Sequence, residues 1–550
     1  MNRYIQFVSI LIKYGFQDIV EQLNLRYYLE LGKSVLMQRP AEQVLSIPRA
    51  VRVRLIIEEM GTTFIKFGQI TSTRPDLIPE EFITELKKLQ DCVPPFPTDD
   101  AVKIIERELD KPTAELFAEF DKEPVASASI AQVYRAVLPS GDEVAIKVQR
   151  PDILKTVETD LEILMDLARL AETHVEAMKT IQPVAIVEEF TRVIEDEMNF
   201  HIEALNIERF LENFSSDTSV HAPRVFRAYS TRSILTTSFI RGIKVSEVEA
   251  LREKGYDTVA LARIGANAVL CQVFEHGFFH ADPHPGNLLV TGPETVCFLD
   301  FGMMGKLDHT IQEALASMLI CVVQRDDERL TRTVLQLAAN ADDIRDTAKL
   351  QRALSDFIDR YAYLPLDQLD VGGLLQDLLH MLIGHGIKLP PEVYLLIKAM
   401  VTIEGVGHML DPGFVFMNYA KPYVEKLVRK QYDPRRVFAD LGKTSMDVYR
   451  LLRDLPAEVR ELLKFIRRGE IKVNLETRSL EPVMKSWDRD ANRLSFALVN
   501  AAMLVSSAII ILAKIPPVWH GASVPGLVSL GVSLLMAFWL LIAIYLSGHL

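Results

Sequence analysis

The chain has 550 residues, which is enough for several domains and a large core. Hydrophobic residues make up 49% and charged residues 25%, and this excludes a wholly disordered or low-complexity protein. The net charge of −13 argues against a general nucleic-acid binder, so we expect no nucleic-acid partner. No C-x-x-C pair occurs, so we expect buried free thiols in a reducing compartment at Cys92, Cys271, Cys297 and Cys321.

The N-terminal segment from Ile5 to Ile12 is apolar, but Lys13 and Asp18 follow and no small-residue cleavage site appears. It is therefore not a signal peptide, and it is too short to span a bilayer. We expect a helix that packs on the protein, with a helix lying on a membrane surface as the alternative.

The first segment that suggests chemistry follows Pro124. A turn-like stretch from Pro139 to Asp142 leads into Val144-Ala145-Ile146-Lys147, which predicts a hairpin and a strand with a lysine on it. Ahead of it, ASASIAQV occupies the register of a kinase glycine-rich loop, with alanine in place of glycine. Alanine disfavours positive φ and adds a methyl group near phosphate, so we expect an altered nucleotide pose. The expected nucleotide contacts are Ala126, Ser127, Ala128, Ser129, Ile130, Ala131 and Val133.

A lysine held over phosphates needs a carboxylate partner. Glu203 lies in a helix-compatible stretch, and Glu158 and Glu162 are competitors between which the sequence does not choose. The stretch from Ile234 to Gly242 predicts a strand that leads to an interlobe hinge, where the backbone near Phe239 and Ile240 is available to adenine.

Two further motifs follow in order. Asp282 and Asn287 have the spacing of H-R-D-x-x-x-x-N, and Asp300-Phe301-Gly302 is a D-F-G. Phosphoryl transfer needs metal ions on the phosphates, a cation and a group that orients the attacking oxygen. We therefore assign Mg²⁺ to Asn287 and Asp300, phosphate to Lys147, and orientation or deprotonation of the nucleophile to Asp282.

A rival interpretation makes His280, Asp282 and His284 ligands of a hydrolytic metal site. Two departures from ordinary kinases bear on the substrate: Ala281 stands where arginine is usual, and no A-P-E follows Gly302. Little room is left for a peptide-docking platform, which argues against phosphorylation of another protein.

The C-terminal part contains two long uncharged stretches, Leu494 to Leu512 and Val524 to Leu546. Each is long enough to cross a bilayer core of about 30 Å. Lysine and arginine before the first stretch predict that the body stays in the cytoplasm. A buried helical hairpin is the alternative. Ser529 and Ser533 lie one helical turn apart and permit a homodimer through helix packing.

Further motifs give a resemblance. The first is Lys66-Phe67-Gly68-Gln69, a K-x-G-Q motif, and the stretches STRPDLIP and LQDCVPP follow it. The others are the alanine loop and the stretch EMNFHIEA that begins at Glu197. In this last stretch Asn199 stands where aspartate is frequent. The sequence resembles the UbiB family of atypical kinases, also called ABC1-type kinase-like proteins, closely from about Glu58 to Gly305. The terminal hairpin also fits bacterial members.

The resemblance implies an α+β, protein-kinase-like two-lobed fold, with an N-terminal helical extension over the cleft and a C-terminal transmembrane hairpin. We expect the extension over residues 1–122, the N-lobe over 123–243, a helical C-lobe over 244–480, a linker over 481–493 and the two membrane helices over 494–546. Lys66 and Gln69 would lie near the nucleotide as catalytic residues, together with Lys147 and Asp282. Glu203 would pair with Lys147 and Glu197 would face Lys66, and both glutamates would belong to the nucleotide site.

The leading hypothesis is a membrane-bound ATPase or atypical kinase that uses ATP and Mg²⁺ and supports ubiquinone biosynthesis at a bacterial inner membrane. Expected partners are lipids of the cytoplasmic membrane face, quinone-precursor lipids and enzymes of ubiquinone biosynthesis. One alternative is a catalytically idle nucleotide-binding scaffold. Another is a small-molecule kinase for a phenolic or lipid hydroxyl.

Overall fold

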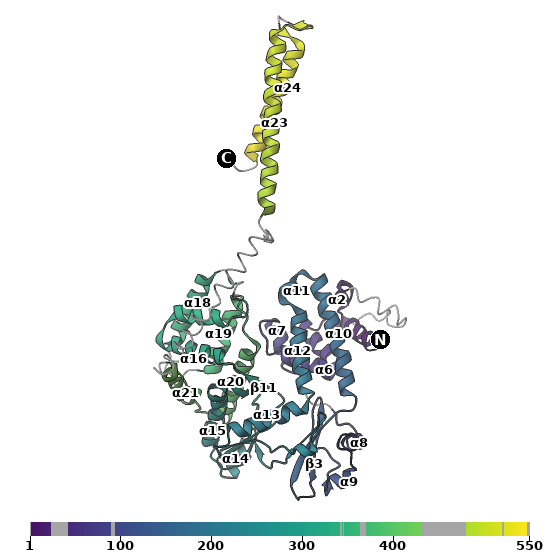
Figure 1. Cartoon of the computed structure of the whole chain (residues 1–550), viewed down its shortest axis with the longest axis vertical. Coiled ribbons are helices and arrows are strands. Elements are labelled where there is room, and N and C mark those ends of the chain that lie inside the picture. Colours follow the sequence, from purple (N-terminus) through teal and green to yellow (C-terminus); the bar gives the residue numbers. More distant parts are fainter. Residues whose placement is uncertain are drawn as a thin grey trace, which may run out of the picture. The chain divides into compact units, whose positions relative to one another are not determined.

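The computed structural model describes residues 2–23, 42–89, 94–341, 344, 346–362, 370–431, 480–519 and 522–546. The chain divides into two compact units, residues 1–438 and 439–550, and each is described by itself. Helices precede the first sheet in the first unit (Figure 1): α1 (Asn2–Lys13), α2 (Gln17–Gln22), α4 (Glu42–Leu45), α5 (Arg49–Met60), α6 (Thr62–Thr71), α7 (Glu80–Leu86), α8 (Thr98–Leu109) and α9 (Thr113–Leu116).

The N-terminal helix α1 is a packing helix, as expected. Phe7, Val8 and Leu11 are buried in the main core of the unit. Arg3 donates two hydrogen bonds, of 2.7 and 3.0 Å, to the buried carboxylate of Asp160. Asp160 belongs to α10 (Ile153–His174), so the start of the chain is fixed to a helix 150 residues later. Figure 1 shows α6 near α10 and α12 (Pro183–Glu197), with which it is in contact.

The predicted hairpin and strands form the first sheet, with strand order β1-β3-β4-β6 and β2 paired to β3. Val144, Ile146 and Val148 alternate along β4 and are fully buried against a core that includes α8. Because side chains alternate across a strand, Lys147 faces the other side of the sheet. The strands are β1 (Glu119–Phe120), β2 (Ala126–Ser127), β3 (Ala131–Val137), β4 (Glu143–Gln149) and β6 (Ile234–Ser238).

Two connecting helices, α11 (Glu176–Ile181) and α13 (Phe200–Asn213), complete this region with α10 and α12. The side chain of Asn199 caps α13 by accepting a hydrogen bond of 3.2 Å from the backbone N–H of His201. Asparagine is a good N-cap residue, so position 199 has a local structural role.

The second lobe contains a four-stranded sheet of order β5-β10-β9-β7 and a separate β8–β11 pair. Its strands are β5 (Val220–His221), β7 (Ile243–Lys244), β8 (Phe278–His280), β9 (Leu288–Gly292), β10 (Thr295–Phe298) and β11 (Met304–Lys306). Its helices are α14 (Val248–Glu253), α15 (Thr258–Cys271), α16 (His309–Gln324), α17 (Asp327–Leu337), α18 (Thr347–Ala362), α19 (Val371–Gly384), α20 (Pro391–Leu410) and α21 (Phe416–Gln431).

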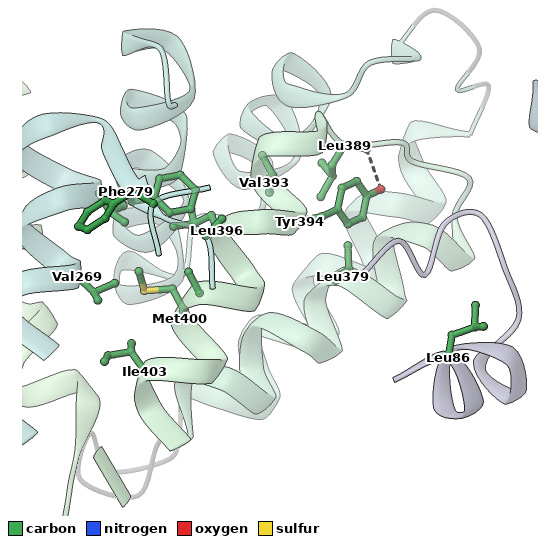
Figure 2. Packing of buried hydrophobic residues seen from close by; sticks show 14 of the residues in the cluster. Leu86, Val269, Phe279, Leu379, Leu389, Val393, Tyr394, Leu396, Met400 and Ile403 are labelled. Atoms are coloured by element: carbon green, nitrogen blue, oxygen red, sulfur yellow. Dashed lines mark hydrogen bonds between the residues drawn. The ribbon is translucent and has the colours of Figure 1, made fainter. Parts of the chain in front are cut away.

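Helix α20 lies in the core of this lobe. Figure 2 shows Met400 and Ile403 of α20 on the side that faces Val269 of α15, and the backbone N–H of Leu389 donates to the hydroxyl of Tyr394 over 3.3 Å. α20 is long and apolar enough to cross a membrane by length and composition, but 61% of it is buried within the protein. We therefore treat it as a core helix.

The second unit contains α23 (Leu480–Leu512), α24 (Val524–Leu546) and a two-stranded connection of β12 (Val518–Trp519) and β13 (Ala522–Ser523). The hydroxyl of Ser507 donates to that of Ser529 over 2.8 Å, so the two helices contact each other. The part of α23 from Ser495 to Leu512 is apolar enough to span a membrane and only 6% buried. Residues 481–493, expected as a linker, are helical and continuous with it.

Candidate active site

Lys147 of β4 is held by two carboxylates. Its Nζ lies 2.9 Å from both side-chain oxygens of Glu203 on α13 and 3.6 Å from Oδ1 of Asp300. The structure therefore selects Glu203 from the three carboxylates that the sequence left open. The ring of Phe200, one helical turn earlier, lies 5.3 Å from the same ammonium group and adds a cation–π contact.

Electrostatics keep this lysine charged. Burial opposes the charged form of Lys147, but the charges of Asp300 and then Glu203 outweigh it and hold the lysine pKa above its usual value. The positive charge of Lys147 also holds the pKa of Asp300 well below its usual range. A permanently charged lysine beside an ionised aspartate is suited to phosphate on one side and a divalent cation on the other.

Asp282 lies on a loop that the backbone and a buried histidine define. His280 of β8 accepts a hydrogen bond of 3.2 Å from the backbone N–H of Asp282 at Nδ1, and its Nε2 lies 3.0 Å from the carbonyl oxygen of Leu299. A neutral ring with the proton on Nε2 makes both contacts. Burial lowers the pKa of His280, which favours this neutral form. Asn287 closes the loop by donating from Nδ2 to the carbonyl of Asp282 over 3.3 Å.

The D-F-G segment is fixed to α13. Asp300 has φ of 53°, in the left-handed region that aspartate tolerates better than most residues, and its Oδ1 accepts a hydrogen bond from the N–H of Gly302. Asn206 of α13 donates to the carbonyl of Phe301 over 3.0 Å. The same helix therefore positions both the partner of Lys147 and the backbone beside Asp300.

The donor set fits Mg²⁺ held together with a nucleotide. Mg²⁺ is usually bound by one or two carboxylates plus phosphate oxygens and water. Asp300 supplies a carboxylate, Asn287 has an amide oxygen with no hydrogen bond within the described part of the chain, and Glu197 has a buried Oε2 without a hydrogen-bond partner. A metal on these residues would need phosphate oxygens to complete its shell.

The rival hydrolytic site has no support in the described residues, which contain no group of three or more histidine, cysteine or acidic side chains arranged to bind a metal. His280 is buried with both ring nitrogens in contact with backbone groups. Nδ1 of His284 accepts a hydrogen bond from the N–H of Gly286, so it stabilises the loop.

The alanine loop is a tight β2–β3 turn. Ala126 pairs with Val133, and Val133 pairs in turn with Lys147, so the loop adjoins the lysine strand. Arg150 fixes the loop by donating to the carbonyl of Ala128 over 3.1 Å and to the hydroxyl of Ser127 over 2.9 Å. The remaining predicted contacts, Ser129, Ile130 and Ala131, are buried in or beside the turn.

The hinge prediction falls at the end of β6. Ser238 is the last residue of that strand, and the backbone N–H of Phe239 donates to the carbonyl of Glu143 over 3.0 Å. Phe239 and Ile240 are both half-buried. They therefore lie at the edge of the lysine sheet, where the chain leaves for the second lobe.

The K-x-G-Q helix α6 reaches the same region from the N-terminal extension. Lys66 forms an ion pair of 2.7 Å with Oε1 of Glu197, and each side chain is only 12% exposed. Gln69 donates to the carbonyl of Leu89 over 3.3 Å, within the extension. A Cβ at Gly68 would lie 2.5 Å from the Leu89 side chain, so the absence of a side chain lets Leu89 pack closely on α6. Gln90 to Val93, including Cys92, lie outside the described residues.

A cavity of about 550 Å³ lies between this extension and the second lobe. Lys66, Gln69 and Glu197 line one part of it, and Asp282 and Lys398 line another. The rest of the lining mixes apolar and polar side chains. The apolar ones include Ile70, Ile83, Leu86, Leu89, Leu379, Tyr394, Ile397 and Val401, and the polar ones include Glu80, Lys87, His284, Gln376, His380 and Thr402.

Sequence reasoning did not find Lys398 or Arg150. Nζ of Lys398, on α20, lies 3.0 Å from Oδ2 of Asp282. One available signal was a lone lysine within an apolar helical stretch. Arg150 gave no comparable signal, because it follows a strand at a position where a solvated arginine is ordinary.

Comparison with known proteins identifies the family. Models described as ABC1 atypical kinase-like domain, UbiB helical domain and ABC1/UbiB kinase-like C-terminal domain match residues 88–334, 354–415 and 478–546. "Probable protein kinase UbiB" of Xanthomonas campestris is 32% identical over 528 residues, which is 94% of each chain. "Uncharacterized protein sll1770" of Synechocystis is 33% identical over 83% of this chain and 79% of its own. "Protein ACTIVITY OF BC1 COMPLEX KINASE 7, chloroplastic" of Arabidopsis thaliana is 33% identical over 77% of this chain and 62% of its own. The chain therefore belongs to the ABC1/UbiB family of atypical kinases.

Proposed function

We propose that this protein is a membrane-bound, Mg²⁺-dependent ATPase or atypical kinase that supports ubiquinone biosynthesis. The observation that supports it best is the arrangement around Lys147, with Glu203 at 2.9 Å and Asp300 at 3.6 Å. A structural ion pair alone would not need the second carboxylate, because Glu203 already satisfies the lysine with both oxygens. The second carboxylate suits a metal–phosphate ligand.

Each residue has a defined task in this proposal. Lys147 binds nucleotide phosphates while Glu203 keeps its ammonium in place, and Asp282 orients the attacking oxygen. Asn287 and Asp300 hold Mg²⁺, which would neutralise charge on the phosphates when bound. The alanine loop, fixed by Arg150, covers the nucleotide, and the backbone at Phe239 and Ile240 meets the adenine.

The cavity beside Asp282 is the proposed place of the phosphate acceptor. It is enclosed in part by Lys66 and Gln69 of α6 and by residues of α7, where a protein substrate would have to approach. A volume of about 550 Å³ is within the range of small-molecule sites, and the lining mixes apolar and polar side chains. Water or the phenolic head of a quinone-precursor lipid fits this description better than a peptide segment.

Membrane attachment is proposed through the second unit. Residues Ser495–Leu512 form a long apolar helix with little burial, and α24 continues with further exposed apolar side chains such as Leu534, Leu535 and Phe538. Exposed apolar surface of this extent is unfavourable in water and favourable in lipid. We place the kinase-like body on the cytoplasmic face of a bacterial inner membrane, within reach of quinone-precursor lipids and the enzymes that modify them. Contact between second units of two copies would give a homodimer.

The test is phosphate release from ATP by the full chain in anionic liposomes, with and without a phenolic quinone-precursor mimic. We expect Mg²⁺-dependent turnover that lipid or phenol stimulates and that Asp300→Asn abolishes. Asp99→Asn, at an exposed position in the first turn of α8, is the matched control and should leave turnover unchanged.

The outcomes separate the three hypotheses. A phosphorylated phenol or lipid would identify a small-molecule kinase, which the cavity next to Asp282 favours. Free phosphate alone would identify an ATPase. ATP binding without either product, under every condition, would refute the proposal and leave the nucleotide-binding scaffold.

A further inference from the structure

Helix α20 has two different faces. Leu396, Met400 and Ile403 lie on the face that packs in the core, and Figure 2 shows Met400 and Ile403 facing Val269 of α15. The opposite face lines the cavity with Tyr394, Ile397, Lys398, Val401 and Thr402. These two sets follow helical spacing, so core packing fixes which side chains α20 presents to the cavity.

Lys398 is the exception on this helix. It is the only charged residue between Glu392 and Glu404, and it lines the cavity on the same face of α20 as the apolar Ile397 and Val401. Its Nζ lies 3.0 Å from Oδ2 of Asp282, the carboxylate assigned to the attacking oxygen. The backbone of Asp282 is fixed by His280 and Asn287, and Lys398 is the ion-pair partner that the structure gives its side chain.

Stability does not account for a lysine at this position. The two side chains are 31% and 30% exposed, and ion pairs with this exposure contribute little to stability. Holding a lysine side chain in one conformation also costs rotamer entropy. An uncharged residue would avoid that entropic cost, so the lysine is better explained by what it does to Asp282.

We propose that Lys398 is a positioning residue for the phosphoryl-transfer step, an inference that rests on the function proposed above. Its ammonium fixes the rotamer of Asp282 so that the carboxylate faces the acceptor oxygen. A lysine on α20 thereby couples the cavity lining of this helix to the loop of Asp282. Lys398 lies on the cavity side, whereas Lys147 is the residue assigned to the nucleotide phosphates. Lys398 should therefore affect the turnover number and not the affinity for ATP.

The test compares Lys398→Met and Lys398→Arg with wild type in the phosphate-release assay, and measures ATP affinity separately with a fluorescent ATP analogue. We expect Lys398→Met to lower kcat by roughly 10- to 100-fold, the size of effect that misplacement by about 1 Å produces. The analogue Kd should stay within about twofold, and Lys398→Arg should restore most of kcat because it keeps the charge. Lys421→Met, at an exposed position on α21, is the control and should behave as wild type.

Equal kcat in Lys398→Met and wild type would overturn the inference, and so would an equal loss of kcat and of nucleotide affinity. Amine acylation footprinting provides a measurement that needs no turnover. Lys398 should be several-fold more reactive in Asp282→Asn than in wild type, because the ion pair protects it. Absence of turnover in wild type would refute the proposed function. Unchanged labelling of Lys398 in Asp282→Asn would refute the inference about Lys398, whether or not the protein shows turnover.

Discussion

The ion pair between Lys66 and Glu197 makes a sharp prediction about how the N-terminal extension is held. Nζ and Oε1 are 2.7 Å apart, each side chain is 12% exposed, and the second oxygen of Glu197 is buried without a partner. Replacing Lys66 by Met removes the cation and leaves the carboxylate of Glu197 without its ion-pair partner. The variant should therefore loosen α6 more than the loss of one contact would suggest.

The magnitude follows from the burial. Removing one partner of a fully buried pair costs about 3–5 kcal/mol, and an exposed pair contributes about 0–1 kcal/mol. Because this pair borders a cavity of about 550 Å³ that water can enter, we expect a value between these limits, about 2 kcal/mol. At 1.36 kcal/mol per factor of ten, this corresponds to opening of α6 that is roughly 30-fold more frequent.

Hydrogen exchange of the α6 backbone amides, followed by mass spectrometry on the full chain, measures this opening directly. Lys66→Met should raise α6 exchange by roughly 30-fold, while exchange in α8, which belongs to a different core, should not change. Combining it with Glu197→Gln should recover part of the protection, because no buried charge is then left unpaired. The reasoning would be refuted by unchanged α6 exchange in the single variant, or by a double variant that exchanges faster than the single one.

Three further outcomes can be checked. Asp300→Asn should remove the increase in ATP affinity that Mg²⁺ produces, while the affinity for metal-free ATP should change little. ATP titrations with and without Mg²⁺ measure both affinities, and an increase that persists in the variant would contradict this prediction. Burial lowers the pKa of His280, so below about pH 6.5 the unfolded chain binds a proton that the folded chain does not, and stability falls as pH decreases. His280→Gln should flatten this dependence of urea midpoints between pH 5 and 7, and an unchanged slope would count against it. Glu404 is buried and accepts hydrogen bonds from the first backbone amides of α19, those of Val371 and Gly372. Glu404→Gln should therefore lower the free energy of unfolding, measured with urea, by about 1–3 kcal/mol. An unchanged free energy of unfolding would show that the amides find other partners.

Local patterns in the sequence predicted the elements around the nucleotide site. The β-branched run ending at Lys147 is a strand, the stretch from Ile234 is its neighbour in the sheet, and Asp300 lies 3.6 Å from Lys147. These predictions worked because each motif requires a particular backbone conformation that its own residues favour. Family membership, suggested by the K-x-G-Q and alanine-loop motifs, is confirmed.

Contacts between distant parts of the chain could not be predicted in this way. The choice of Glu203 over Glu158 and Glu162 depends on how α13 packs beneath the sheet, and periodicity does not give that angle. Lys398 meets Asp282 across more than a hundred residues, through the rotation of α20 about its axis. Residues 481–493, predicted as a linker, belong to α23, because the charged residues in this segment are compatible with a helix.

The contacts of α1 and α6 have a consequence for synthesis of the chain. Both helices pack on α10, and α6 also packs on α12, so their apolar faces are complete only when residues up to Glu197 have left the ribosome. Translation proceeds at about 5–20 residues per second, so the end of α12 follows the end of α6 by several seconds to roughly half a minute. During that interval Phe7, Val8 and Phe64 have no partner from the kinase-like body. A nascent chain stopped near residue 120 should bind hydrophobic chaperones, and one extended well past residue 200 should release them.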